Sequence, residues 1–246
     1  MIETARSAAG QTCASSDWCP CCGRFEATTF SPVMWPELGE EWGLSSEEYA
    51  YVDRQQGCRC AYCGANLRTR VLARAVLQTL GVRGGFRDFA QSIRGRLLRI
   101  LEINEAGDLS RFFPSWSRHR LMRYPDLDMM AMKQISENTY DLIIHSDTLE
   151  HVPDPVRGLS ECCRVLKPGG ACCFTVPMIV GRLSRFRKGL TPSYHGGEGD
   201  HRLDYLVHTE YGADAWRQVL QAGFTECRIM AEAPPAAHAL VGIKAH

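Results

Sequence analysis

Four cysteines form two pairs with the spacing of a metal site. Cys19 and Cys22 are separated by two residues, as are Cys60 and Cys63, and a glycine follows each pair. A two-residue gap lets both thiolates of a pair reach one zinc ion at about 2.3 Å, and the glycine permits the tight turn behind them. Two such pairs complete a closed structural zinc site with no open position for chemistry. The sequence therefore predicts structural Zn²⁺ on Cys19, Cys22, Cys60 and Cys63, in a zinc-ribbon-like module.

Other cysteines leave alternatives open. The chain has 12 cysteines, and seven of them lie between Cys13 and Cys63. Cys21 or Cys58 could replace a predicted ligand, while a disulfide pair is a weaker alternative because disulfides are rare in the reducing cytosol. The segment between the pairs is acidic and aromatic, as in residues 36–42 (PELGEEW), and this composition opposes phosphate contact. We therefore predict a packing or substrate-gating module.

The loop from Arg182 to His208 is rich in His, Tyr and Arg. These residue types are suited to holding a polar group and taking its proton. Neutral imidazole accepts protons near pH 7. We therefore predict His195 as the preferred general base, with His208 and His151 as alternatives. Arg182 and Arg185, together with His195, are candidates for binding an anionic or polar acceptor. The alternative for the two arginines is a solvated loop.

Alternating strands and helices must position these side chains. Buried strands are predicted at residues 97–103, 119–124, 140–146, 171–177, 225–231 and 237–244, and helices at 65–80, 155–166 and 211–222. The first 64 residues show no sustained period and are predicted to be irregular. Strands that alternate with helices indicate a mainly parallel sheet with helices on both faces.

Local signals mark the helix ends and a domain boundary. Asp154 as N-cap with Pro155 at the first helical position begins one helix, and Gly81 ends another. Further glycines after Gly81 suggest a division into residues 1–82, a zinc-binding module with a linking helix, and residues 83–246, the α/β domain. Three arginines lie mostly off the apolar stripe of the linking helix and are predicted to form a solvated face, with a nucleic-acid patch as the alternative: Arg68, Arg70 and Arg74.

One segment carries a family resemblance. Residues 141–155 (DLIIHSDTLEHVPDP), followed by residues 164–170 (RVLKPGG), resemble the class I S-adenosylmethionine (SAM)-dependent methyltransferase superfamily, and most closely its members that begin with two CxxC pairs. The resemblance implies a Rossmann-like, seven-stranded, doubly wound sheet, with SAM across the carboxyl ends of the first strands. Open α/β sheets bind ligands where the strand order reverses, which agrees with this placement.

The resemblance also implies cofactor-binding positions. The loop after the first strand has Asn104 and Ala106 where the family has glycines, and Asn tolerates left-handed backbone angles better than most residues. Asp126 is a candidate for the ribose hydroxyls and Asp128 for the acid whose neighbours contact adenine, with turn residues as the alternative. The full implied set is Glu102, Asn104, Gly107, Asp126, Asp128, Met129, His145 and Ser146.

Charge and hydropathy narrow the function. Basic and acidic residues both number 28, so no bulk charge steers the chain toward nucleic acid. No apolar run approaches the roughly 20 residues that span a bilayer, and the start lacks the features of a secretory signal. The expectation is a cytoplasmic protein with a small-molecule partner and no nucleic-acid or membrane partner.

The combined prediction is an enzyme that transfers a methyl group from SAM to a small polar acceptor, most often at oxygen or nitrogen. One alternative keeps the fold and changes the target to RNA or protein. A positive face formed by residues 68–74 and 182–188 would support it. The other alternative is a SAM-binding protein that is regulatory or catalyses a reaction other than methylation, and the altered glycine loop motivates it.

Overall fold

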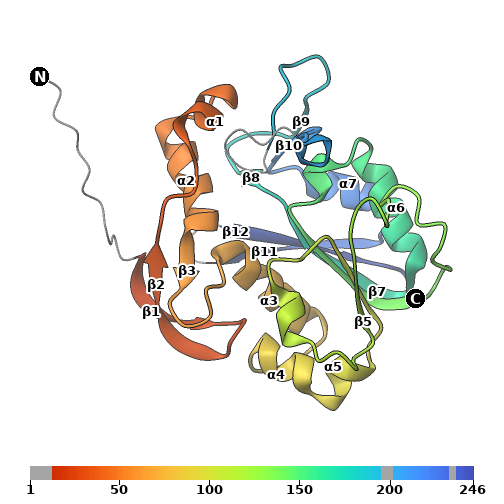
Figure 1. Ribbon diagram of the computed structural model, residues 1–246. Helices are drawn as coiled ribbons and strands as arrows, with labels where there is room; N and C mark the ends of the chain where they lie inside the picture. The colour runs from red at the N-terminus through yellow and green to blue at the C-terminus, as the bar shows by residue number, and fades with distance from the viewer. Residues whose placement is uncertain (1–12, 195–201, 233–236) are drawn as a thin grey trace, which may run out of the picture.

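The computed structural model describes residues 13–194, 202–232 and 237–246, and it confirms an α/β fold (Figure 1). The strands of the central sheet are β4 (Ile100–Ile103), β5 (His119–Met122), β6 (Tyr140–Ser146), β7 (Leu166–Thr175), β11 (Glu226–Glu232) and β12 (Ala237–Ile243). Their order is β11-β12-β7-β6-β4-β5. β5, β4, β6 and β7 pair in parallel, whereas β12 and β11 join antiparallel. The next strand after β4, β5, lies on one side of it, and the following strand, β6, lies on the other side. The strand order therefore reverses between β4 and β6.

Within the described residues the central sheet has six strands rather than the predicted seven. Residues 123–139, between β5 and β6, form turns. The buried apolar side chains of this segment are Leu127, Met129, Met132 and Ile135. Their spacing of two or three residues gives no alternating face that could continue the sheet.

Two apolar cores lie on the two faces of this sheet. Successive residues of β6 alternate between them: Leu142 and Ile144 face one core and Ile143 faces the other. The first core contains helices α3 (Leu67–Thr79) and α4 (Phe86–Gln91), and the second contains α6 (Pro155–Val165) and α7 (Trp216–Gln221). A short helix, α5 (Ile93–Leu97), precedes β4.

Helix α3 confirms the predicted linking helix but corrects its arginines. Asn66 caps its start by accepting a hydrogen bond from the Thr69 amide, and Gly81 follows its end with φ of 62°. Arg68 and Arg70 are only 4% and 2% exposed. The predicted solvated face is wrong because α3 packs against the central sheet and also against the N-terminal cysteines, so both sides of the helix are covered.

The N-terminal region is ordered where it was predicted to be irregular. Strands β1 (Cys13–Cys19), β2 (Arg24–Phe30) and β3 (Cys58–Cys60) form a separate antiparallel sheet. Between β2 and β3 lie helices α1 (Pro36–Glu41) and α2 (Ser46–Gly57). A capping box between Ser45 and Glu48 begins α2. We call residues 31–57 the insert.

A second small sheet lies beside the insert (Figure 1). It contains β8 (Met178–Ile179), β9 (Arg185–Phe186) and β10 (Thr209–Gly212), in the order β8-β10-β9. We call residues 178–194 and 202–212 the cap. β10 occupies the beginning of the helix predicted at 211–222, so α7 is shorter than expected. In the part of the chain that the structure describes, no helix is long and apolar enough to span a membrane. The predicted boundary after residue 82 stays a prediction.

Candidate functional site

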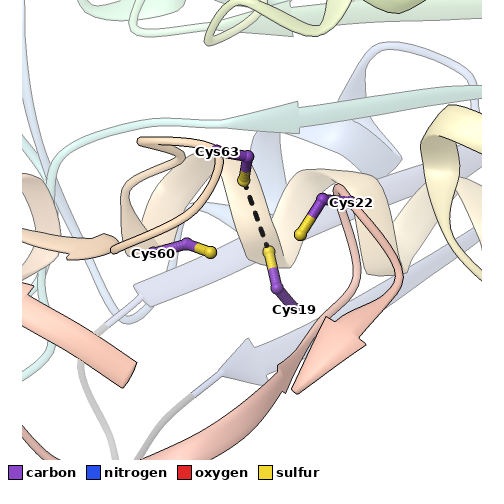
Figure 2. Close-up of side chains that lie close together, drawn as sticks. All are labelled: Cys19, Cys22, Cys60 and Cys63. Atoms are coloured by element: carbon purple, nitrogen blue, oxygen red, sulfur yellow. Dashed lines mark hydrogen bonds between the residues drawn. The ribbon is translucent and has the colours of Figure 1, made fainter. Parts of the chain in front are cut away.

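The four predicted cysteine ligands come together between β1 and β3 (Figure 2). Cys19 and Cys22 flank the turn after β1, and Cys60 and Cys63 flank the turn after β3. Behind each pair the glycine has a left-handed backbone, with φ of 72° at Gly23 and 71° at Gly64. Each glycine amide donates to the carbonyl of the first cysteine of its pair at 2.8 Å. Both turns therefore direct two thiols toward one point.

The spacing of the sulfur atoms fits zinc. All four lie within 4.8 Å of one another, and the sulfurs of Cys19 and Cys63 are 3.7 Å apart. A tetrahedral ion with bonds of about 2.3 Å requires sulfurs about 3.8 Å apart. Neither alternative cysteine belongs to this quartet: the Cys21 thiol faces the Thr69 carbonyl at 3.6 Å, and Cys58 is in a disulfide. The cluster suits the predicted structural zinc.

A cavity of about 830 Å³ lies at the carboxyl ends of β4 and β6. This volume is within the range of small-molecule and cofactor sites, and the position is the point where the strand order reverses. Seven residues singled out from the sequence line it: Asn104, Gly107, Asp128, Met129, Ser146, His151 and His208. The cavity wall also contains residues from α3, from the 3₁₀-helix η2 (Leu149–His151) and from the cap.

The loop after β4 adopts left-handed backbone angles although Asn104 and Ala106 replace the glycines expected there. Asn104 has φ of 59° and Gly107 also has φ of 59°, so Asn104 occupies the left-handed region as expected. A Cβ at Gly107 would lie 2.4 Å from the Thr69 hydroxyl, so only glycine fits there. Glu102 accepts a hydrogen bond from the Ala106 amide at 2.7 Å and holds the loop against the sheet.

Three implied cofactor residues do not line the cavity. Glu102 is fully buried, and its second oxygen contacts His119 Nε2 at 2.6 Å, so it supports the loop from behind. Asp126 is exposed in the turn that follows β5. His145 points into a core and stacks on Phe174 with ring centroids 4.7 Å apart. Burial lowers the pKa of His145 to about 3, so this imidazole is neutral.

The cavity also contains residues that the sequence did not identify. Arg68 and Thr69, in the first turn of α3, line the cavity together with Asn66, the N-cap residue of this helix. Arg68 Nη1 donates to the carboxylate of Asp147 at 2.5 Å, and Asp147 follows β6 with φ of 48°. An asparagine before an apolar periodic segment is a sequence signal for a helix start. No local pattern shows that the start of α3 lies at the carboxyl ends of the strands.

The three histidine candidates have different outcomes. His151 and His208 line the cavity, whereas His195 lies outside the described residues. His151 Nδ1 is 3.1 Å from the carbonyl oxygen of Leu206. A carbonyl only accepts, so the ring carries its proton on Nδ1 and Nε2 is the proton-accepting nitrogen. Burial, as the largest cause, lowers the pKa of His151 and favours the neutral base at pH 7.

The cap arginines make ion pairs with the protein. Arg182 binds Glu48 in the insert, while Arg185 and Arg187 both bind Glu210. Neither Arg182 nor Arg185 lines the cavity. The expected acceptor-binding role therefore finds no support, because both side chains lie outside the cavity lining.

Comparison with known proteins agrees with this geometry. Residues 107–174 match the family model described as a methyltransferase domain. The ubiquinone biosynthesis O-methyltransferase of Psychrobacter arcticus is 24% identical over 182 residues, covering 70% of this chain and 68% of the relative. The enzyme of that name from Pseudomonas savastanoi pv. phaseolicola is 27% identical over 96 residues. That match covers 39% of this chain and only 41% of the relative.

A solved structure is also similar. The CurJ carbon methyltransferase has a TM-score of 0.42 and 14% identity, over 85% of this chain and 70% of that one. The match to the domain model and the reversal of strand order beside the cavity support a class I SAM-dependent methyltransferase domain. Residues 107–174 are thus similar to that family, and a four-cysteine module lies at the N-terminal side of the chain.

Proposed function

We propose that the protein binds SAM in the cavity and transfers its methyl group to a small polar acceptor at oxygen or nitrogen. The observation that carries this proposal is the cavity itself, which lies at the switch point of the sheet and takes half of its lining residues from the segment that matches the methyltransferase domain. SAM supplies an already activated methyl group. The protein must therefore bind and align donor and acceptor, exclude water and receive a proton.

The residues of the cavity divide naturally between these tasks. Arg68 and the first turn of α3 suit the carboxylate of the methionine part of SAM, because a guanidinium and a helix N-terminus both favour an anion. Asp128 and Met129 lie after β5, where the resemblance puts adenine. On the acceptor side, His151 Nε2 receives the proton of a hydroxyl or ammonium group. His208, from the cap, stands beside it as the next candidate.

The alternative of an RNA or protein substrate loses its main support in this structure. The positive face that motivated it requires exposed arginines at residues 68–74 and 182–188. Arg68 and Arg70 are buried, Arg74 pairs with Glu232, and Arg182, Arg185 and Arg187 are ion-paired. These ion pairs offset the positive charge that the arginines could offer to a phosphate backbone, which favours the small-molecule proposal.

Incubation with methyl-labelled SAM and a panel of small acceptors tests the proposal. The panel should contain phenols, carboxylates and amines, with RNA and a protein extract as further arms. The expected result is label in a small phenol or amine, with equimolar S-adenosylhomocysteine. Label only in RNA or protein, or cofactor binding without transfer to any arm, would contradict the proposed acceptor class.

The cofactor role of Arg68 is open to a direct measurement. Arg68→Met should weaken S-adenosylhomocysteine binding by about 10- to 100-fold, since a hydrogen bond to a charged group contributes roughly 1.5–3 kcal/mol. Isothermal calorimetry measures the change. Arg74→Met is the matched control: it removes an ion-paired arginine from the same helix, and Arg74 does not line the cavity. Equal losses in both variants would show that Arg68 acts only through folding.

A further inference from the structure

The insert is fixed at both ends to the four-cysteine module. Phe30 pairs with Cys58 across β2 and β3, and the Ser31 amide donates to the Gly57 carbonyl at 3.1 Å. Cys60, one of the four clustered cysteines, lies at the end of the same short strand β3. The insert therefore leaves and re-enters the module at adjacent points, and its two helices extend away as one arm (Figure 1).

This arm packs against the cap through an apolar cluster. Leu38, Trp42 and Val52 of the insert are buried together with Ile179 and Val207 of the cap. All five side chains are at most 5% exposed. Because interiors are closely packed, a shift of the arm would displace the cap residues in contact with it.

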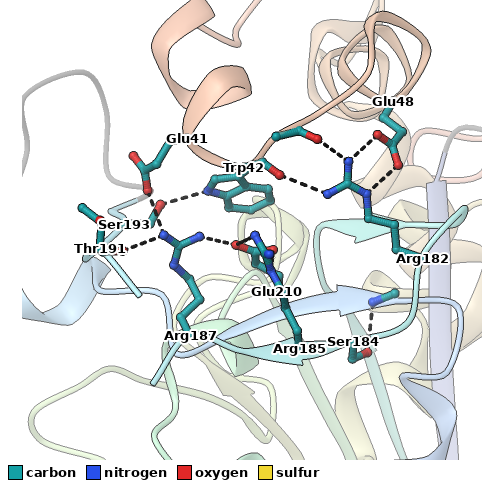
Figure 3. Close-up of polar contacts among 12 residues, drawn as sticks. Glu41, Trp42, Glu48, Arg182, Ser184, Arg185, Arg187, Thr191, Ser193 and Glu210 are labelled. Carbon is teal, nitrogen blue, oxygen red and sulfur yellow. Dashed lines mark hydrogen bonds and ion pairs between the residues drawn. The ribbon is translucent and has the colours of Figure 1, made fainter. Parts of the chain in front are cut away.

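Polar contacts fix the relative position of arm and cap (Figure 3). Arg182 binds both carboxylate oxygens of Glu48 at 2.5 and 2.6 Å, and it also donates to the carbonyls of Trp42 and Gly43. The hydrogen bonds from Arg182 lower the pKa of Glu48 to about 2, so this carboxylate stays ionised. A bidentate pair of this kind adds geometric specificity as well as attraction.

A chain of hydrogen bonds continues from the arm to His151. Trp42 Nε1 donates to the Ser193 hydroxyl at 2.9 Å, and the Ser193 carbonyl accepts from the Val207 amide at 2.9 Å. The residue before Val207 is Leu206, whose carbonyl faces His151 Nδ1. The residue after it, His208, donates its amide to the Glu150 carbonyl at 2.7 Å. The segment supported by the arm is therefore the one that orients His151.

We propose that the insert is the positioning element for the base His151, with Arg182 and Trp42 as the positioning residues. By holding residues 206–208 in place, the arm keeps the Leu206 carbonyl against Nδ1 and thereby keeps Nε2 as the proton acceptor. This inference rests on the proposed role of His151 in methyl transfer. It gives the N-terminal module a function at the acceptor side of the cavity.

The ring tautomer of His151 tests this proposal without any acceptor. Long-range ¹H–¹⁵N spectra distinguish a proton on Nδ1 from one on Nε2, and the signal of His151 is assigned by its loss in His151→Gln. The wild-type ring should carry its proton on Nδ1. Arg182→Met should produce a mixture of both tautomers, and Arg182→Lys should restore part of the wild-type signal because it keeps the charge.

Arg164→Met is a closely matched control. Arg164 also binds both oxygens of a carboxylate, that of Glu161, and donates to two backbone carbonyls. Its side chain is 34% exposed, against 30% for Arg182. It lies on α6, and its bonds involve neither the insert nor the cap. This control should leave the His151 tautomer unchanged.

Turnover and cofactor affinity complete the test. With the best acceptor of the panel, Arg182→Met should lower kcat on the order of tenfold and leave S-adenosylhomocysteine affinity within about twofold. If Arg182→Met does not fold, it is replaced by Trp42→Phe, which keeps an aromatic ring in the apolar cluster and removes the donor. An unchanged tautomer in a folded variant would overturn the positioning role. Failure of the wild type to bind S-adenosylhomocysteine would instead refute the proposed function, while the tautomer would still test the arm.

Discussion

Replacement of Cys60 by serine is expected to remove most of the zinc and to destabilise the whole protein. Cys19, Cys22 and Cys60 are buried in the same core as α3 and the central sheet, so a loosened metal site also loosens the packing of the cofactor cavity. Structural zinc contributes about 10–16 kcal/mol of binding free energy in small zinc domains. Loss of even about 4 kcal/mol lowers the melting temperature by roughly 8–16 °C in a protein of this size.

Elemental analysis and scanning calorimetry measure these two effects. The wild type should contain close to one zinc per chain, and Cys60→Ser should contain much less and melt earlier. Cys227→Ser is the control, since Cys227 is a partly buried thiol on β11 outside the cluster. A wild-type protein that is purified without metal and melts at the same temperature after zinc is added would contradict the structural role.

Replacement of His151 by glutamine should lower turnover by about 10²- to 10⁴-fold, which is the usual contribution of a positioned base. Cofactor affinity should change little, because the imidazole is assigned to the acceptor. His238→Gln is the control: His238 is also partly buried and hydrogen-bonded to a tyrosine, Tyr51, but it does not line the cavity. Steady-state kinetics and calorimetry on the same preparations separate the two effects.

The pH dependence of the wild type follows from the same residue. Because burial lowers the pKa of His151 below its ordinary value of about 6.5, the neutral base predominates at pH 7. The value of kcat/KM should therefore be level near neutrality and fall only at acidic pH, below the ordinary range of an imidazole, as the ring becomes protonated. Turnover that survives in His151→Gln with an unchanged pH profile would transfer the role to His208.

The four-cysteine cluster and the class of the fold were readable from sequence because both depend on local spacing. Two cysteines three positions apart, followed by a glycine, specify a turn whatever the rest of the chain does. The strand and helix from Asp141 to Val165 are likewise bounded by short-range signals, including the cap at Asp154. The helices of the insert were missed although Ser45 and Glu48 carry a capping box, because no long apolar period follows it.

The details of the cavity depend on packing between distant segments. β6 is buried along nearly its whole length, with no alternation of buried and exposed positions, so the sequence does not show that His145 faces a core while Ser146 lines the cavity. Arg68 becomes a cavity residue only because α3 places its first turn at the edge of the sheet. Arg182 pairs with Glu48, which lies 134 positions earlier in the chain. No local sequence pattern predicts such a pair.

Calorimetric titration of S-adenosylhomocysteine into the folded, zinc-loaded wild type tests the central claim most directly. The cavity between β4, β6 and α3 should bind one ligand per chain, with a dissociation constant between about 1 μM and 1 mM, the range of typical Michaelis constants. Arg68→Met should weaken this binding, and Arg74→Met should not. Absence of any binding heat at millimolar ligand, or equal binding by wild type and Arg68→Met, would contradict the assignment of this cavity to SAM.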